Sequence, residues 1–169
     1  MRRGIRSGYC DDATHPAEYG SWTVGEYPEA RFLWTHRDPA AVLGSVCSLI
    51  EYCRSWVSDQ DSPGIGEQQA GVWEEALRRA IAFRDRCGEE RFADVRFDDL
   101  NADPVETVRS AYSAIGLTLG SSAAQRMELW AAAHRRGAQG THEYAIEDFG
   151  LSPAAVRTRF GFYMERFKL

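Results

Sequence analysis

Arg37 and Ser45 have side chains whose types and spacing could bind an anion. Arg37 stands in Thr-His-Arg-Asp-Pro, directly after an apolar run, and Ser45 follows eight positions later. Asp38 is a preferred helix N-cap and Pro39 suits the first helical position, so Ser45 should lie roughly 10 Å along the helix on the same face as the cap. A guanidinium, a helix N-terminus and a hydroxyl group together attract phosphate oxygens. The pattern is typical of a phosphate site, but also of a surface ion pair between arginine and aspartate.

A strand and a helix must hold these two residues in place. The segment from Arg31 to Thr35 is short and rich in aromatic and branched side chains, which predicts a buried strand. Apolar residues at helical spacing then predict a helix as far as Val57, through Val42, Leu43, Val46, Leu49 and Ile50. We therefore expect Arg37 in the turn at the carboxyl end of the strand, where open parallel sheets bind ligands.

Later segments repeat the order of strand and helix. After a loop at residues 58–67, we expect a second strand at 91–97 and helices near 67–86, 104–116, 122–135 and 152–167. This alternation predicts a helix-rich α/β fold with a short parallel sheet. Because two strands make a small sheet, further strands either lie in the irregular lead-in at residues 1–25 or belong to something larger. Four aromatic residues at helical spacing are expected in the core: Trp73, Trp130, Phe160 and Tyr163.

Composition limits the class of protein. The chain has 169 residues, 44% of them hydrophobic and 27% charged, which is typical of a globular domain. A net charge of −5 gives no reason to expect a nucleic-acid partner. We find no apolar run long enough to span a membrane and no signal peptide, which favours a cytoplasmic protein. The four cysteines lack metal-ligand spacing, so we expect no metal, and buried or partly buried thiols at Cys10, Cys47, Cys53 and Cys87.

Three blocks of sequence carry a family resemblance. They are "PEARFLWTHRDPAAVLGSVCSLI", "VRFDDLNADPVETVRSAYSAIGL" and "HEYAIEDFGLSPAAVRTRFGFYMERF". Together they resemble the C-terminal half of the sulfotransferase family, particularly its bacterial branch, over residues 26–169. The resemblance implies part of a three-layer fold like that of P-loop NTPases. It also implies transfer of a sulfuryl group from 3'-phosphoadenosine 5'-phosphosulfate to a hydroxyl or amine.

The resemblance also assigns residues to the nucleotide. Arg37 and Ser45 match the arginine and serine that hold the 3'-phosphate in the family. Phe97 matches the aromatic residue that the family brings toward the adenine. The segment "RRGAQG" matches a basic loop that closes over the 3'-phosphate, and it would contribute Arg135, Arg136 and Gly137. Taken alone, that segment is equally typical of a helix C-terminus with cations near its negative end.

Two other parts of the family site have no counterpart in the sequence. The glycine- and hydroxyl-rich loop that wraps the 5'-phosphosulfate is not recognisable here. A general base must lie within hydrogen-bond reach of the acceptor, but no histidine or carboxylate matches a family motif. His15, Glu18, His36 and His142 remain unassigned candidates for this role. Whether the chain is an enzyme is therefore left open, and the acceptor is a small molecule that the sequence does not identify.

An alternative to catalysis remains. The chain could be a truncated, non-catalytic remnant that binds nucleotide weakly, or that acts by association with another chain. Without further strands, the faces of the sheet and helices would lack cover, which favours self-association.

Overall fold

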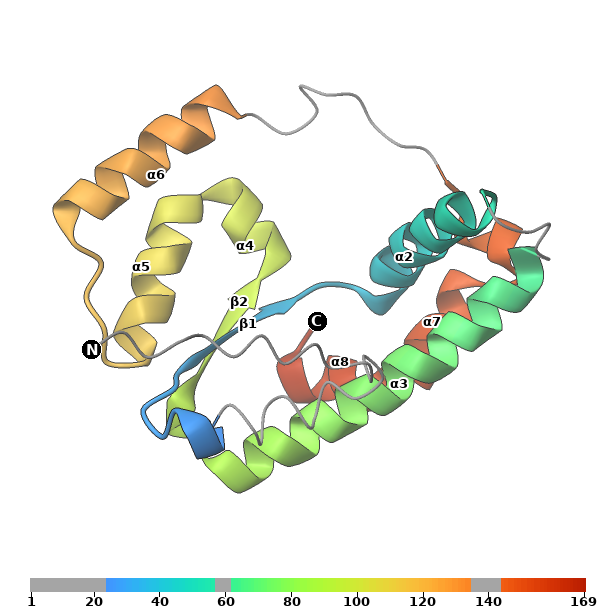
Figure 1. Cartoon of the computed structure of the whole chain (residues 1–169), viewed down its shortest axis with the longest axis horizontal. Helices are drawn as coiled ribbons and strands as arrows, with labels where there is room; N and C mark the ends of the chain where they lie inside the picture. The colour runs from blue at the N-terminus through green and yellow to red at the C-terminus, as the bar shows by residue number, and fades with distance from the viewer. Residues whose placement is uncertain (1–23, 57–61, 135–143) are drawn as a thin grey trace, which may run out of the picture.

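The computed structural model describes residues 24–56, 62–134 and 144–169, with the side chains of residues 62 and 63 left aside. A short parallel sheet lies at the centre, with helices on both sides of it (Figure 1). In chain order the elements are β1 (Phe32–His36), α2 (Pro39–Arg54), α3 (Ser62–Cys87), η1 (Glu89–Arg91), β2 (Phe92–Arg96), α4 (Phe97–Ala102), α5 (Pro104–Ala114), α6 (Ser121–Ala133), η2 (Ile146–Phe149), α7 (Pro153–Arg159) and α8 (Gly161–Phe167).

Strands β1 and β2 are parallel neighbours, joined by the long connection through α2 and α3. Their register pairs Phe32 with Phe92 at one end and His36 with Arg96 at the other. Each strand therefore ends at the same edge of the sheet, and each is followed closely by a helix. This arrangement confirms the predicted helix-rich α/β fold with a short parallel sheet.

The polar residue before each proline starts a helix as the sequence predicts. The Asp38 carboxylate accepts a hydrogen bond from the Ala40 N–H at 2.9 Å. Asp103 likewise accepts from the Glu106 N–H at 3.1 Å, at the start of α5. Each carboxylate satisfies a backbone donor that has no partner within its helix, which fixes where the helix begins.

Two groups of buried side chains flank the strands. One joins α2, α3, η2 and the C-terminal helices, and consists of Ala40, Leu43, Ala70, Ile146, Val156 and Phe160. The other joins β2 to α5, and consists of Ala93, Val95, Ala111 and Ile115. Figure 1 shows the corresponding division, with α4, α5 and α6 on one side of the strands and α2, α3 and α7 on the other.

Several predicted boundaries are wrong. Helix α3 begins at Ser62 rather than Glu67, because its glycine-containing first turns pack closely on η2. Residues 97–102, between the second predicted strand and the next predicted helix, form the short helix α4. The last helix is interrupted at Phe160, whose φ of −93° and ψ of 15° separate α7 from α8.

Two expectations about burial are also wrong. Cys47 is buried and Cys87 is half-buried, but Cys53 is exposed on the outer side of α2. Cys10 lies outside the described residues. Trp130 is 64% exposed on α6, so it is not a core residue. None of the helices in the described ranges is long and apolar enough to cross a membrane.

Candidate functional site

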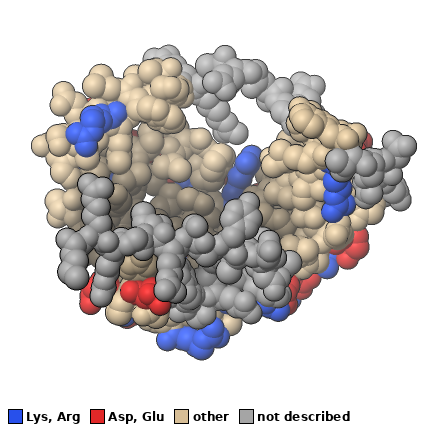
Figure 2. Space-filling model, viewed as in Figure 1, with Lys and Arg blue, Asp and Glu red and all other residues tan. Residues whose placement is uncertain are grey.

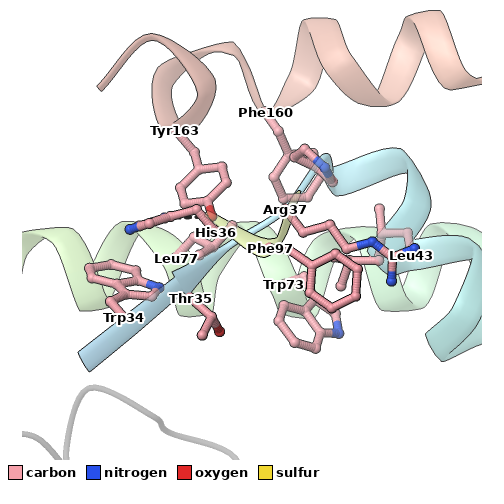
Figure 3. A pocket seen from close by; sticks show the side chains of 12 residues that line it. Trp34, Thr35, His36, Arg37, Leu43, Trp73, Leu77, Phe97, Phe160 and Tyr163 are labelled. Atoms are coloured by element: carbon pink, nitrogen blue, oxygen red, sulfur yellow. Dashed lines mark hydrogen bonds between the residues drawn. The ribbon is translucent and has the colours of Figure 1, made fainter. Parts of the chain in front are cut away.

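Arg37 and Phe97 meet at the carboxyl edge of the sheet. Each directly follows the last residue of its strand, and those last residues are paired with one another. The guanidinium carbon of Arg37 lies 4.4 Å from the centroid of the Phe97 ring (Figure 3). Such a contact is a cation–π interaction. The guanidinium group carries five N–H donors, so it can also bind an anion.

Asp38, the residue after Arg37, forms its salt bridge with a different arginine. One oxygen of Asp38 caps α2, and the other accepts from Nη2 of Arg157, on α7, at 2.6 Å. Burial acts to raise the pKa of Asp38, but the hydrogen bonds from Arg157 and from the backbone hold it below its ordinary value. Within residues 24–56, 62–134 and 144–169, Arg37 forms no salt bridge. A surface ion pair between Arg37 and Asp38 is therefore not what the structure contains.

Ser45 is exposed on α2, beside a glycine that receives an aromatic ring. A Cβ atom at Gly44 would lie 2.7 Å from Cε2 of Tyr144, so only glycine lets this ring lie against the helix as it does. The Tyr144 hydroxyl also donates to the carbonyl of Ala41 at 3.4 Å. Tyr144 is the first described residue after position 143, so the chain leaving the basic segment meets α2 next to Ser45.

The remaining site candidates cannot be placed. Arg135, Arg136 and Gly137 lie outside the described residues, as do His15, Glu18 and His142. The roles suggested for them stay predictions. No group of three or more histidine, cysteine, aspartate or glutamate side chains that could hold a metal occurs in the part of the chain that the structure describes.

A cavity of about 240 Å³ opens beside Arg37. Its walls are mainly aromatic, and its lining includes Trp34, His36, Arg37, Trp73, Phe97 and Phe160. Figure 3 shows how these side chains converge from β1, α3, α4 and the C-terminal helices. In the space-filling view the surface is hollowed between the two groups of helices, and a basic side chain is visible within the hollow (Figure 2). The arrangement suits a planar, anionic ligand.

His36 is buried next to the site and forms two hydrogen bonds. Its Nε2 atom lies 2.7 Å from the Asp94 carboxylate, and its Nδ1 atom lies 2.9 Å from the Tyr163 hydroxyl. Burial lowers the pKa of His36 more than the contact with Asp94 raises it. Two cations, Arg84 and Arg96, also contribute to this lowering. Both imidazole nitrogens are occupied, so His36 is held as a neutral structural residue.

Sequence reasoning missed the partners of His36. Arg84 is buried in α3, and its guanidinium bonds Asp94 at 2.5 Å and 2.9 Å and Glu89 at 2.5 Å and 2.8 Å. These contacts raise the pKa of Arg84, which stays charged. The one available signal was an aspartate in an otherwise apolar strand, which implies a buried or half-buried partner. The partners of Asp94 are Arg84 and His36, which lie 10 and 58 residues away in the sequence, so local patterns do not reveal them.

The comparisons with known proteins agree with this geometry. A model of the sulfotransferase family matches residues 5–121. The crystal structure of sulfotransferase STF9 from Mycobacterium avium aligns with a TM-score of 0.79 at 25% identity, covering 91% of this chain and 40% of that chain. That of sulfotransferase STF1 from Mycobacterium tuberculosis H37Rv aligns with a TM-score of 0.68 at 31% identity, covering 84% and 36% respectively. No curated protein sequence gives a significant match.

The fold is therefore that of sulfotransferases, which is related to the P-loop fold. The chain belongs to the sulfotransferase family, because the family model matches more than half of its length. It spans less than half of the two solved sulfotransferases, and their activity is not assigned to it on this basis.

Proposed function

We propose that this chain binds 3'-phosphoadenosine 5'-phosphosulfate for sulfuryl transfer to a hydroxyl or amine acceptor. Arg37 and Ser45 bind the 3'-phosphate in this proposal, and the basic segment of Arg135, Arg136 and Gly137 closes over it. The nucleotide would supply the activated sulfuryl group. The chain's own described residues bind and orient the nucleotide, and the catalytic base stays unassigned.

The contact between Arg37 and Phe97 is the observation that carries the proposal. Adjacent parallel strands deliver a guanidinium and an aromatic ring to the same point, at the N-terminus of α2. The pair therefore presents a cation and an aromatic ring side by side, which are the groups that attract a phosphate and a base. The N–H edge of Arg37 and the first turn of α2 supply donors and positive potential for phosphate. A site of this kind suits a nucleotide that carries a phosphate close to its base.

The position of Tyr144 supports the role of the basic segment. Its ring rests on Gly44, one residue before Ser45, and it follows Gly137 by only seven residues. Seven residues can span roughly 25 Å when extended, so Arg135 and Arg136 are within reach of the N-terminus of α2. The length of chain therefore allows the basic segment to reach a phosphate bound there.

Calorimetric titration with 3',5'-adenosine bisphosphate tests the proposal. We expect weak but measurable binding by the wild type. Arg37→Ala should lower the affinity by about 1.5–3 kcal/mol because it removes a charge-assisted hydrogen bond. Ser45→Ala should lower it by about 0.5–1.5 kcal/mol, the value of a neutral hydrogen bond.

Arg109→Ala is the matched control. Arg109 is an exposed arginine on α5 that pairs with Glu106 at 3.2 Å, and its loss changes the net charge by the same amount. The control should bind like the wild type. Tight binding that neither Arg37→Ala nor Ser45→Ala weakens would refute the site.

A second function, association without catalysis, has its own support. Leu33 of β1 is 48% exposed, and α2 with the turn that follows it presents the exposed residues Leu49, Tyr52 and Trp56. These apolar surfaces favour pairing with a second copy of the chain. Light scattering should then give a dimer that Trp56→Ser weakens. A monomer at all concentrations would exclude this function.

A further inference from the structure

Helix α8 is tied to the last residue of both strands. The Tyr163 hydroxyl lies 2.9 Å from His36, which ends β1. Nη1 of Arg96, which ends β2, donates to the carbonyl of Lys168 at 2.8 Å. The next residue after each strand is Arg37 or Phe97, the pair that forms the candidate site. The end of the chain therefore holds the two strand ends one residue before the site.

We propose that Tyr163 is a positioning residue for Arg37, acting through its hydroxyl group on the end of β1. The inference rests on the proposed function only in taking Arg37 as the phosphate-binding side chain. Tyr163 is 4% exposed and lies on α8, far from Arg37 in the sequence. The backbone N–H of Arg37 also acts on this hydroxyl, where it tends to lower the pKa of Tyr163.

The hydrogen bonds have one consistent direction. Asp94 is bonded by the buried guanidinium of Arg84, so its carboxylate is ionised and can only accept. His36 must then donate from Nε2 to Asp94, which leaves Nδ1 as an acceptor in the neutral ring. Nδ1 therefore accepts the proton of the Tyr163 hydroxyl, and the phenolic oxygen is left to interact with the Arg37 N–H.

Other contacts keep this chain of bonds in place. Burial raises the pKa of Tyr163 to about 12, so its hydroxyl stays protonated and remains a donor. The imidazole of His36 stacks on the ring of Phe167, which lies on α8 together with Tyr163, and the two centroids are 4.2 Å apart. Arg84 is 5% exposed and is fixed by two carboxylates. The network begins at a fixed charge in α3 and ends at the backbone of the candidate site.

Tyr163→Phe removes the hydroxyl and keeps the packed ring. We expect two results in the full chain. Hydrogen exchange at the Arg37 amide should become at least 10-fold faster, because the oxygen that it interacts with is gone. The affinity for 3',5'-adenosine bisphosphate should fall about 10-fold, while the affinity for adenosine 5'-monophosphate should not change.

A double variant separates positioning from a general structural role. If Tyr163 acts through Arg37, adding Tyr163→Phe to Arg37→Ala should cause no further loss of bisphosphate affinity, whereas a structural effect would add to it. Tyr112→Phe, on the half-buried tyrosine of α5, is the matched control and should change neither measurement. Unchanged exchange at Arg37 in Tyr163→Phe, or additive losses in the double variant, would overturn the inference. If the wild type binds no bisphosphate, the proposed function fails, and the amide exchange alone decides whether Tyr163 positions Arg37.

Discussion

The guanidinium of Arg37 and the carboxylate of Asp38 are adjacent in sequence but have different partners. Arg157 bonds Asp38 at 2.6 Å, and Arg37 lies over Phe97 instead. A cation–π contact is worth about 0.5–1 kcal/mol at an exposed site, so it helps to hold Arg37 against the ring. The sequence alone showed the spacing of Arg37 and Ser45. It did not show the contact between Arg157 and Asp38, because these residues are 119 positions apart.

The buried histidine gives a prediction on pH. His36 has an ordinary value of 6.5 and a lowered pKa in the folded protein, so the unfolded chain binds its proton first as the pH falls. The contribution of His36 to the free energy of unfolding is therefore fully present above about pH 6.5. It is lost as the pH falls toward the pKa of His36 in the folded protein. The groups that face the ring are Asp94, Arg84, Arg96 and Tyr163.

Chemical denaturation between pH 8 and pH 5 measures this effect. The unfolding free energy of the wild type should fall in acid by at most about 1.4 kcal/mol per pH unit for one proton. His36→Gln should show a shallower fall relative to its own value at pH 8. His134→Gln, at an exposed position after α6, is the control and should follow the wild type. Equal slopes in His36→Gln and the wild type would contradict the assignment.

At the scale of elements, close packing decides where α3 begins. Gly66 lies against the backbone of η2, and a Cβ atom there would overlap the carbonyl oxygen of Phe149. The backbone cannot move aside as a side chain can. The sequence suggested a loop here because proline and two glycines stand together, yet Gly66 is required for the approach of another segment. The sequence does not show this contact, because η2 lies about 80 positions later in the chain.

Two glycines of α3 give a matched pair of variants. Gly66→Ala should destabilise the protein by about 1–3 kcal/mol or more, because the added methyl group meets backbone atoms. Gly71→Ala, in the same helix, meets only Nη2 of Arg159 at 3.8 Å and should be neutral or stabilise by up to about 1 kcal/mol. Thermal denaturation measures both. Similar midpoints for the two variants would show that the contact with η2 is not close.

The order of strands and helices was predictable, but several ends were not. Aspartate or serine before proline correctly marked the starts of α2, α5 and α7, because capping is a local interaction. The break at Phe160 was missed, since the apolar spacing continues across it. Trp130 was placed in the core for its spacing alone, although α6 has only one fully buried residue, Ala124. Periodicity shows which face is apolar but not whether another element covers it.

At the scale of the whole molecule, the chain corresponds to part of a larger fold. It covers 40% and 36% of the two solved sulfotransferases while aligning over most of its own length. Its two-stranded sheet and its exposed apolar side chains fit this relation. The described residues bring the Arg37 guanidinium and the Phe97 ring together at the carboxyl edge of this sheet.

The central claim is that Arg37 binds the 3'-phosphate of the nucleotide. It is tested most directly by calorimetric titration of the wild type and Arg37→Ala with 3',5'-adenosine bisphosphate and with adenosine 5'-monophosphate. We predict that the wild type prefers the bisphosphate, and that Arg37→Ala reduces this preference by about 1.5–3 kcal/mol, the value of a charge-assisted hydrogen bond, while binding the monophosphate as before. An unchanged preference in Arg37→Ala would contradict the account.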